Sequence, residues 1–85
     1  MKPKTVRLFV KTYCPWCHEA IAWLEERAIP FERLEVDVDS AAMNEMVELS
    51  GQRKAPVIEV DGDVLADFGA DELGAWWKQK GLEPK

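Results

Sequence analysis

Residues 6–17 have the sequence VRLFVKTYCPWC, and the character of the chain changes within this stretch. Mostly apolar and β-branched residues predict a buried strand over 5–10. Further along, apolar residues recur at helical spacing, which predicts a helix over 15–28. The chain has two cysteines, Cys14 and Cys17, and both lie at this junction between strand and helix.

The spacing of the cysteines favours thiol exchange. A Cys-x-x-Cys beside a βαβ pattern is typical of thioredoxin-like redox sites. The thiolate is the nucleophile, but a free cysteine with a pKa of about 8.5 is mostly protonated at neutral pH. With Cys14 at the helix N-cap, unpaired N–H groups and the helix dipole would stabilise its anion. We therefore expect Cys14 to attack a disulfide and the more covered Cys17 to resolve the product.

The middle of the chain predicts a second strand and a second helix. Ile29-Pro30 should end the first helix, because a residue before proline is pushed out of the helical region. Alternating apolar residues predict a strand over 31–38, parallel to the first because a helix joins the two. A helix is expected over about 41–50, capped by Asp39 or Ser40.

The last third of the chain predicts a hairpin followed by a helix. Residues 56–66 contain two strand-like runs separated by Asp61-Gly62, a favoured two-residue hairpin turn. A last helix is expected to follow Asp71 and to end at Gly81 and Pro84. The element order βαβαββα predicts an α/β fold with a small four-stranded mixed sheet flanked by helices.

The composition indicates a single small domain over residues 1–85. Apolar residues make up 47% of the chain, with four tryptophans and three phenylalanines, which favours a packed core. The net charge of −5 argues against nucleic acid or an anionic membrane as the main partner. With neither a targeting segment nor an apolar run of about 18 residues, we expect a cytoplasmic protein.

Three segments make the sequence resemble the glutaredoxin family over residues 6–82. Residues 11–17 (KTYCPWC) are similar to the family's Lys-x-x-Cys-Pro-Tyr-Cys motif, with Trp16 in place of tyrosine. Residues 52–56 (QRKAP) are similar to its Thr-Val-Pro segment, whose proline is cis, and residues 69–73 (GADEL) to its Gly-Gly-x-Asp turn. The resemblance implies a thioredoxin-like, glutaredoxin-type fold and a monomeric dithiol oxidoreductase.

The resemblance also implies a binding site for glutathione. Pro56 would lie against the dithiol, and the Ala55 backbone would pair with the cysteinyl part of glutathione. The cationic side chains of Lys11 and Arg53 would meet its glycyl carboxylate, and the start of the last helix would hold the γ-glutamyl end. Glutathione would act as co-substrate, with no bound cofactor or metal. The expected glutathione-binding residues are Lys11, Tyr13, Trp16, Arg53, Ala55, Pro56, Ala70 and Asp71.

Two departures from the family pattern leave the reductant open. Lys54-Ala55 replaces the family's Thr-Val, and Asp67-Phe68 stands where an apolar residue and a first glycine are usual. Asp67-Phe68 is similar to part of the Gly-Phe-x-x-Asp segment of small glutaredoxin-like hydrogen donors for ribonucleotide reductase, which thioredoxin reductase reduces. The substrates would be disulfide-containing or glutathionylated proteins, or ribonucleotide reductase.

Other functions are also compatible with the motif. Residues 14–18 spell the Cys-x-x-Cys-His of c-type haem attachment, which requires an exported chain. Two cysteines and one histidine fall one ligand short of a structural zinc site. A non-enzymatic carrier of an iron–sulfur cluster and a redox-inert binding module with two buried cysteines are further alternatives. Lys11 and Arg53 could equally be ordinary surface charges, Trp16 a packing residue and Asp71 a plain helix N-cap.

Overall fold

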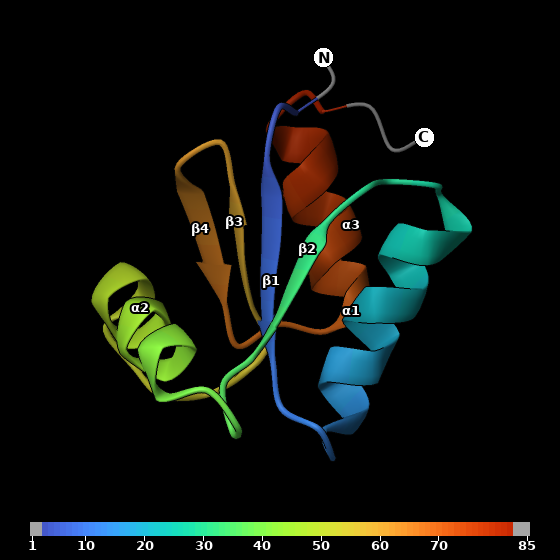
Figure 1. Cartoon of the computed structure of the whole chain (residues 1–85). Helices are drawn as coiled ribbons and strands as arrows, with labels where there is room; N and C mark the ends of the chain where they lie inside the picture. Colours follow the sequence, from blue (N-terminus) through green and yellow to red (C-terminus); the bar gives the residue numbers. More distant parts are fainter. Residues whose placement is uncertain (1–2, 83–85) are drawn as a thin grey trace.

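The structure, a computed structural model, describes residues 3–82 as a four-stranded sheet with helices on both faces (Figure 1). Its elements are β1 (Val6–Val10), α1 (Pro15–Glu26), β2 (Glu32–Glu35), α2 (Ser40–Ser50), β3 (Val57–Val60), β4 (Asp63–Ala66) and α3 (Ala70–Gln79). The strand order is β2-β1-β3-β4, with β1 parallel to β2 and the other two pairings antiparallel. The predicted order βαβαββα and the mixed sheet are confirmed.

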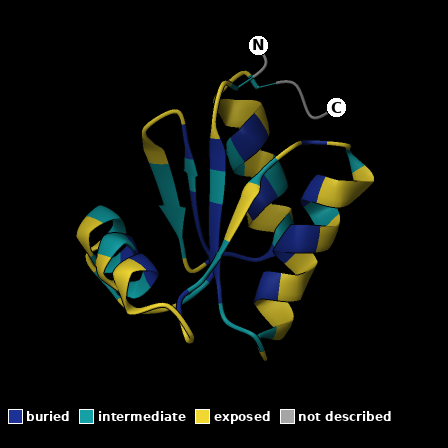
Figure 2. Ribbon diagram, in the orientation of Figure 1, coloured by how far each residue is buried: buried dark blue, intermediate teal, exposed yellow. Residues whose placement is uncertain are grey.

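Side chains of β1 alternate between two cores on opposite faces of the sheet, as the period of a strand requires. Leu8 and Val10 face the core that α1 and α3 cover, whereas Phe9 faces the core under α2. Figure 2 shows buried residues along the inward sides of all three helices. The larger core also contains Cys17, so the redox motif is anchored in the packed interior.

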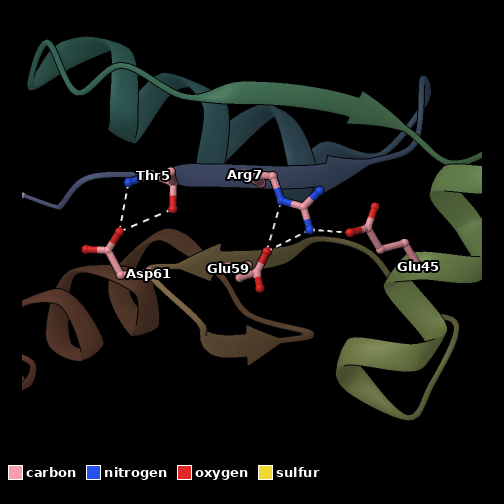
Figure 3. Close-up of polar contacts among 5 residues, drawn as sticks. All are labelled: Thr5, Arg7, Glu45, Glu59 and Asp61. Atoms are coloured by element: carbon pink, nitrogen blue, oxygen red, sulfur yellow. Dashed lines mark hydrogen bonds and ion pairs between the residues drawn. The ribbon is translucent and has the colours of Figure 1, made fainter.

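Arg7 links α2 to the sheet on the Phe9 side. Its guanidinium group donates to the Glu59 carboxylate on β3 at 2.7 and 2.9 Å, and it contacts the Glu45 carboxylate on α2 (Figure 3). Its Cζ atom also lies 5.3 Å from the centre of the Phe9 ring. Hydrogen bonds with Glu45 and Glu59 raise the pKa of Arg7, and the bond with Arg7 lowers the pKa of Glu45. These contacts tie α2 to the two central strands.

Strand β2 is shorter than the predicted 31–38. It ends at Glu35, and the next residue, Val36, donates its N–H to the Val10 carbonyl at 2.9 Å. Because β1 ends at Val10, the chain has no strand partner farther on and turns away from the sheet. Val38 is therefore 74% exposed, although the sequence pattern placed it on the buried side.

Helix α1 ends at Glu26, two residues before the predicted end. Ala28 takes a left-handed φ of 56°, and its N–H donates to the Glu25 carbonyl at 3.1 Å. The Ile29 N–H donates to the Leu24 carbonyl at 3.0 Å, which completes a Schellman motif. Glycine usually occupies the left-handed position of this motif, so an alanine there gave no signal in the sequence.

Helix α3 begins earlier than predicted. Its N-cap is Gly69, whose N–H donates to the Glu72 side chain at 2.6 Å. Asp71 lies inside the first turn, so the prediction that it precedes or caps the helix was wrong. Gly81, with a φ of 72°, follows the helix as predicted, whereas the predicted stop at Pro84 lies outside the described residues.

The cap of α2 agrees with the prediction. The Asp39 side chain accepts hydrogen bonds from the N–H groups of Ala41 and Ala42 at 3.0 and 3.3 Å. Gly51 ends the helix in the left-handed conformation, with a φ of 72°. Within residues 3–82, no helix combines the length and the apolar character needed to cross a bilayer.

The predicted Asp61-Gly62 turn joins β3 and β4, and both residues have a positive φ (51° and 95°). The Asp61 carboxylate accepts hydrogen bonds from the N–H groups of Lys4 at 3.0 Å and Thr5 at 2.8 Å. It also accepts one from the Thr5 hydroxyl at 3.2 Å (Figure 3). The backbone bonds to Lys4 and Thr5 lower the pKa of Asp61, so its charged form fastens the segment before β1 to the hairpin.

We expect Asp61→Asn to lower the urea midpoint of unfolding at neutral pH, because the neutral amide accepts these bonds less strongly. Folding lowers the pKa of Asp61 below its usual 3.8, so its stabilisation is present above that pH. The stabilisation is lost as the pH falls through the folded value. The difference between wild type and variant should therefore shrink below pH 3.8, as followed by circular dichroism.

Asp63→Asn provides the matched control for this prediction. It removes the same charge from the same hairpin, together with an exposed contact to Lys80 at 3.3 Å, and leaves the Asp61 bonds in place. We expect a smaller change in the midpoint. An effect of Asp61→Asn that stays constant with pH would show that the carboxylate charge is not its cause.

A candidate dithiol redox site at the start of helix α1

Cys14 is the N-cap residue of α1, with an extended backbone (φ −133°, ψ 107°). The N–H of Cys17 donates to the Cys14 sulfur at 3.3 Å. Pro15 occupies the first helical position, where no N–H donor is needed. Cys14 is half-buried, so part of it is open to solvent. The amide hydrogen and the helix N-terminus both favour a negative charge on this sulfur.

Cys17 lies one turn into the same helix, in a different environment. It is fully buried in the larger core, and it is a free thiol like Cys14. Burial raises the pKa of the Cys17 thiol to about 12, and its hydrogen bond with Cys14 acts in the same direction. The backbone N–H and the charge of Lys11 partly oppose this shift. Cys17 is therefore a neutral thiol at neutral pH, and the two sulfurs of the motif are unequal.

The segment between α2 and β3 lies against Cys14. The Ala55–Pro56 peptide bond is cis, as the family resemblance implies, and Pro56 is buried. The Ala55 carbonyl oxygen lies 4.0 Å from the Cys14 sulfur, within reach of an S–H donor. The Asp67 N–H donates to the Pro56 carbonyl at 2.9 Å and fastens this segment to the end of β4. A stretch distant in the sequence therefore forms one side of the site.

Trp16 packs against the start of α3. A Cβ atom on Gly69 would lie only 3.0 Å from Cζ3 of the Trp16 ring, so this close approach depends on glycine. Trp16 and Gly69 line a pocket of about 240 Å³ together with Asp67, Phe68 and Glu72. Trp16 is nevertheless 58% exposed. It both packs against α3 and presents an open surface two residues from Cys14.

The other residues predicted to bind glutathione have varied exposure. Tyr13 is 93% exposed, Arg53 is exposed, and Lys11 is half-buried. Ala70 is half-buried and Asp71 is exposed in the first turn of α3. The structure thus brings Ala55 to Cys14 and brings Trp16 to the start of α3. The contacts of the whole predicted set with glutathione stay predictions.

Sequence reasoning missed two residues that hold the loop before Cys14. The Thr12 N–H donates to the Asp37 carboxylate at 2.9 Å, which lowers the pKa of Asp37. Nε2 of His18 lies 3.0 Å from the Thr12 carbonyl oxygen, and it must be the donor because a carbonyl only accepts. A signal existed for Asp37. Parallel strands end at one edge of the sheet, so residues that follow β2 meet residues that follow β1.

The haem alternative does not fit the site. Attachment through Cys-x-x-Cys-His would need both sulfurs and the histidine to be accessible, but Cys17 is fully buried. His18 is held by the Thr12 carbonyl through Nε2. In the part of the chain from 3 to 82, no three His, Cys, Asp or Glu side chains gather in a way that could hold a metal ion.

Comparison with known proteins places the chain in a family. The Glutaredoxin family model matches residues 6–65. This chain belongs to the glutaredoxin family. Glutaredoxin 3 of Escherichia coli is 34% identical over 79 residues, which cover 93% of each chain. The glutaredoxin-like protein NrdH of Lactococcus lactis is 31% identical over 68 residues, 80% of this chain and 93% of the relative.

The solved structures agree on the fold. A glutaredoxin from Archaeoglobus fulgidus superposes with a TM-score of 0.73 at 17% identity and covers 82% of both chains. The sheet and helices described above are therefore the thioredoxin-like, glutaredoxin-type fold that the sequence predicted. The chain is a redox protein of the glutaredoxin family, and the family supports thiol–disulfide exchange as its general chemistry.

Proposed function

We propose that this chain is a dithiol oxidoreductase that uses glutathione to reduce protein disulfides and glutathionylated thiols. The inequality of its two sulfurs carries the proposal. Cys14 is half-buried with an amide N–H at 3.3 Å, whereas Cys17 is fully buried and protonated. An attacking thiol must be accessible and easily ionised, and a resolving thiol should react only after a mixed disulfide has formed. A monomeric state and a cytoplasmic location stay predictions from the sequence.

In the first step, the Cys14 thiolate attacks one sulfur of the substrate disulfide. A bond forms between Cys14 and this sulfur, the substrate S–S bond breaks, and the departing thiolate takes a proton from solvent. One disulfide replaces another, so no net oxidation occurs. The product is a mixed disulfide at Cys14.

In the second step, Cys17 releases the substrate. Burial raises the pKa of Cys17, and the hydrogen bond and charge of Cys14 raise it further. The two contributions from Cys14 end once Cys14 is bound in the mixed disulfide, so Cys17 then ionises more readily. Its thiolate attacks Cys14, the substrate thiolate leaves and is protonated, and a disulfide joins the two cysteines. Two glutathione molecules then supply two electrons and become glutathione disulfide.

A second candidate function is a hydrogen donor for ribonucleotide reductase that thioredoxin reductase reduces. Phe68 favours it, because this residue stands where a glycine is usual in the glutathione-binding members that the sequence resembles. Phe68 is 3% exposed and lines the pocket beside Trp16. The similarity to the NrdH protein of Lactococcus lactis supports the same alternative.

Turnover with two reductants separates the two functions. We expect a small disulfide, bis(2-hydroxyethyl) disulfide, to be reduced faster with glutathione and glutathione reductase than with thioredoxin reductase, both followed as NADPH oxidation. A higher rate with thioredoxin reductase would favour the hydrogen donor. Turnover with neither reductant would contradict both functions. Because Cys14→Ser lacks the attacking sulfur, it supplies the background rate in each assay.

A further inference from the structure

A pocket lies between α1 and α3, away from the dithiol. It has a volume of about 590 Å³, within the range of pockets that hold small organic ligands. In Figure 1 the two helices run side by side, and their last turns lie at the opposite end of the domain from the start of α1. Trp23 is nine residues beyond Cys14, which places it about 13 Å farther along the helix axis. The lining of this α1–α3 pocket includes Trp23, Arg27, Gly74, Trp77, Lys78 and Leu82.

The walls of the α1–α3 pocket are largely aromatic. The rings of Trp23 and Trp77 meet edge to face, with their centroids 5.5 Å apart. The Arg27 guanidinium group lies over the Trp23 ring, with its Cζ atom 4.2 Å from the ring centroid. Indole rings and the guanidinium plane both stack on other flat π-systems. The pocket therefore suits a ligand with a flat apolar body.

Gly74 leaves space in the pocket on the side of α3. Glycine is among the least favourable residues inside a helix, and Gly74 is not one of the glycines with a positive φ. A Cβ atom at this position would lie 3.5 Å from Nε1 of Trp23 and 3.7 Å from its Cζ2, which are ordinary contact distances. Neither the backbone nor the packing therefore requires glycine here. What the glycine provides is room beside the Trp23 ring.

Two cationic side chains give the pocket a positive charge. Nη1 of Arg27 donates to the Trp23 carbonyl at 3.0 Å and lies 3.6 Å from the exposed Glu26 carboxylate. The other guanidinium N–H groups of Arg27 and the exposed Lys78 ammonium group have no polar partner within residues 3–82. Among the described residues that line the pocket none is Asp or Glu, although the chain has a net charge of −5. The local charge therefore favours an anionic ligand.

The nearby end of α1 does not oppose an anion strongly. The C-terminus of a helix carries partial negative charge on its unpaired carbonyl groups. Here the Leu24 carbonyl accepts from the Ile29 N–H at 3.0 Å, and the Glu25 carbonyl accepts from the Ala28 N–H at 3.1 Å. These bonds reduce the exposed negative charge, so the two cations dominate the pocket.

We propose that the α1–α3 pocket binds a small aromatic carboxylate. The aromatic body lies against Trp23 in the space left by Gly74. The carboxylate accepts hydrogen bonds from the free N–H groups of Arg27 and is attracted by the charge of Lys78. This binding function is separate from thiol exchange, because no residue of the pocket belongs to the dithiol site described above.

The test uses two naphthalene probes of opposite charge. 2-Naphthoate is titrated into the ¹⁵N-labelled full-length protein, and binding is followed by the indole N–H signals of the four tryptophans, assigned with single Trp→Phe variants. We expect the Trp23 and Trp77 signals to shift together and to saturate with a Kd of about 1 mM or below. The Trp16 signal, next to Cys14, should stay unchanged. 2-Naphthylmethylammonium should give no saturating shift, because Arg27 and Lys78 repel it.

Variants in and beside the pocket locate the site. Arg27→Gln should weaken binding of 2-naphthoate by about tenfold, because it removes a charged hydrogen-bond donor. Arg33→Gln is its control, because it removes the same charge from an exposed position outside the pocket. Gly74→Leu should abolish binding by filling the space, and leucine is a better helix former than glycine. Ala75→Leu, at an exposed position of the same helix, should bind like wild type.

Several results would overturn the proposal. They are no saturating shift with 2-naphthoate, a shift confined to Trp16, equal binding of the two probes, or wild-type binding by Gly74→Leu. Disulfide turnover of the same variants is measured separately, and Gly74→Leu should keep the wild-type rate. Loss of turnover in wild type would contradict the proposed function and leave this site untouched. Should Gly74→Leu not fold, Gly74→Ala adds only a Cβ atom at contact distance and should still weaken binding.

Discussion

Replacing Cys14 by serine should reduce turnover of every disulfide substrate by about a thousandfold or more, since loss of a nucleophile removes the covalent step itself. Cys17 cannot take over the attack, because it is fully buried and burial raises its pKa to about 12. The measurement is NADPH oxidation coupled through the reductase that supports wild-type turnover. Turnover of Cys14→Ser within tenfold of wild type would contradict the assignment of Cys14 as the attacking residue.

Cys17→Ser provides the comparison for this experiment. Glutathione can release a glutathione mixed disulfide from Cys14 without Cys17, so we expect the variant to keep deglutathionylation. It should lose most reduction of protein disulfides, which needs the internal attack. Iodoacetamide at neutral pH should modify wild type once, at Cys14, because Cys17 stays a buried neutral thiol. Equal losses in both cysteine variants would contradict the division of roles.

Trp77→Ala is expected to destabilise the domain by about 3–5 kcal/mol, the usual cost of removing a large buried aromatic side chain. Trp77 is 1% exposed, and its ring packs edge-on to Trp23 at 5.5 Å and to Trp76 at 6.5 Å. Its removal opens a cavity between α1 and α3, the helices that cover the larger core. Because small domains have a total free energy of unfolding of roughly 5–15 kcal/mol, this loss should remove a large part of it. Urea unfolding followed by circular dichroism measures the change.

Trp76→Ala removes the same type of side chain from the same helix. Trp76 is only half-buried, and its ring contacts Lys80 at 5.6 Å near the surface. We expect a clearly smaller loss of stability. Comparable losses in the two variants would mean that the contact between the two indole rings, and not burial, determines the effect.

Elements whose signals are local could be predicted from the sequence. The strand that ends at Val10 follows from its run of β-branched and apolar residues. The start of α1 follows from Cys14-Pro15, and the hairpin from Asp61-Gly62. Each signal depends on residues within a few positions, because caps and tight turns are made by neighbouring backbone groups.

Boundaries that depend on distant partners were predicted less well. The alternation of apolar residues continues to Val38 in the sequence. However, the last residue of β1, Val10, pairs with Glu35, so the chain beyond Glu35 has no strand beside it and Val38 is exposed. The end of α1 at a left-handed Ala28 had no glycine to mark it. The start of α3 at Gly69 depends on Glu72, and the close packing of Trp16 there became visible only in three dimensions.

The sequence by itself determined the order of strands and helices and the presence of two thiols at the opening of a helix, because residue spacing and capping act within one or two turns. The sequence also predicted that Cys14 attacks and that the more covered Cys17 resolves, but the surroundings that make the two thiols unequal were decided by the tertiary structure. Cys17 is buried in a core built by several strands and helices, and the Ala55 carbonyl lies beside Cys14, so both surroundings come from segments far apart in the chain. The ionisation of a sulfur depends on the solvent and dipoles around it, and these are set by packing and not by spacing.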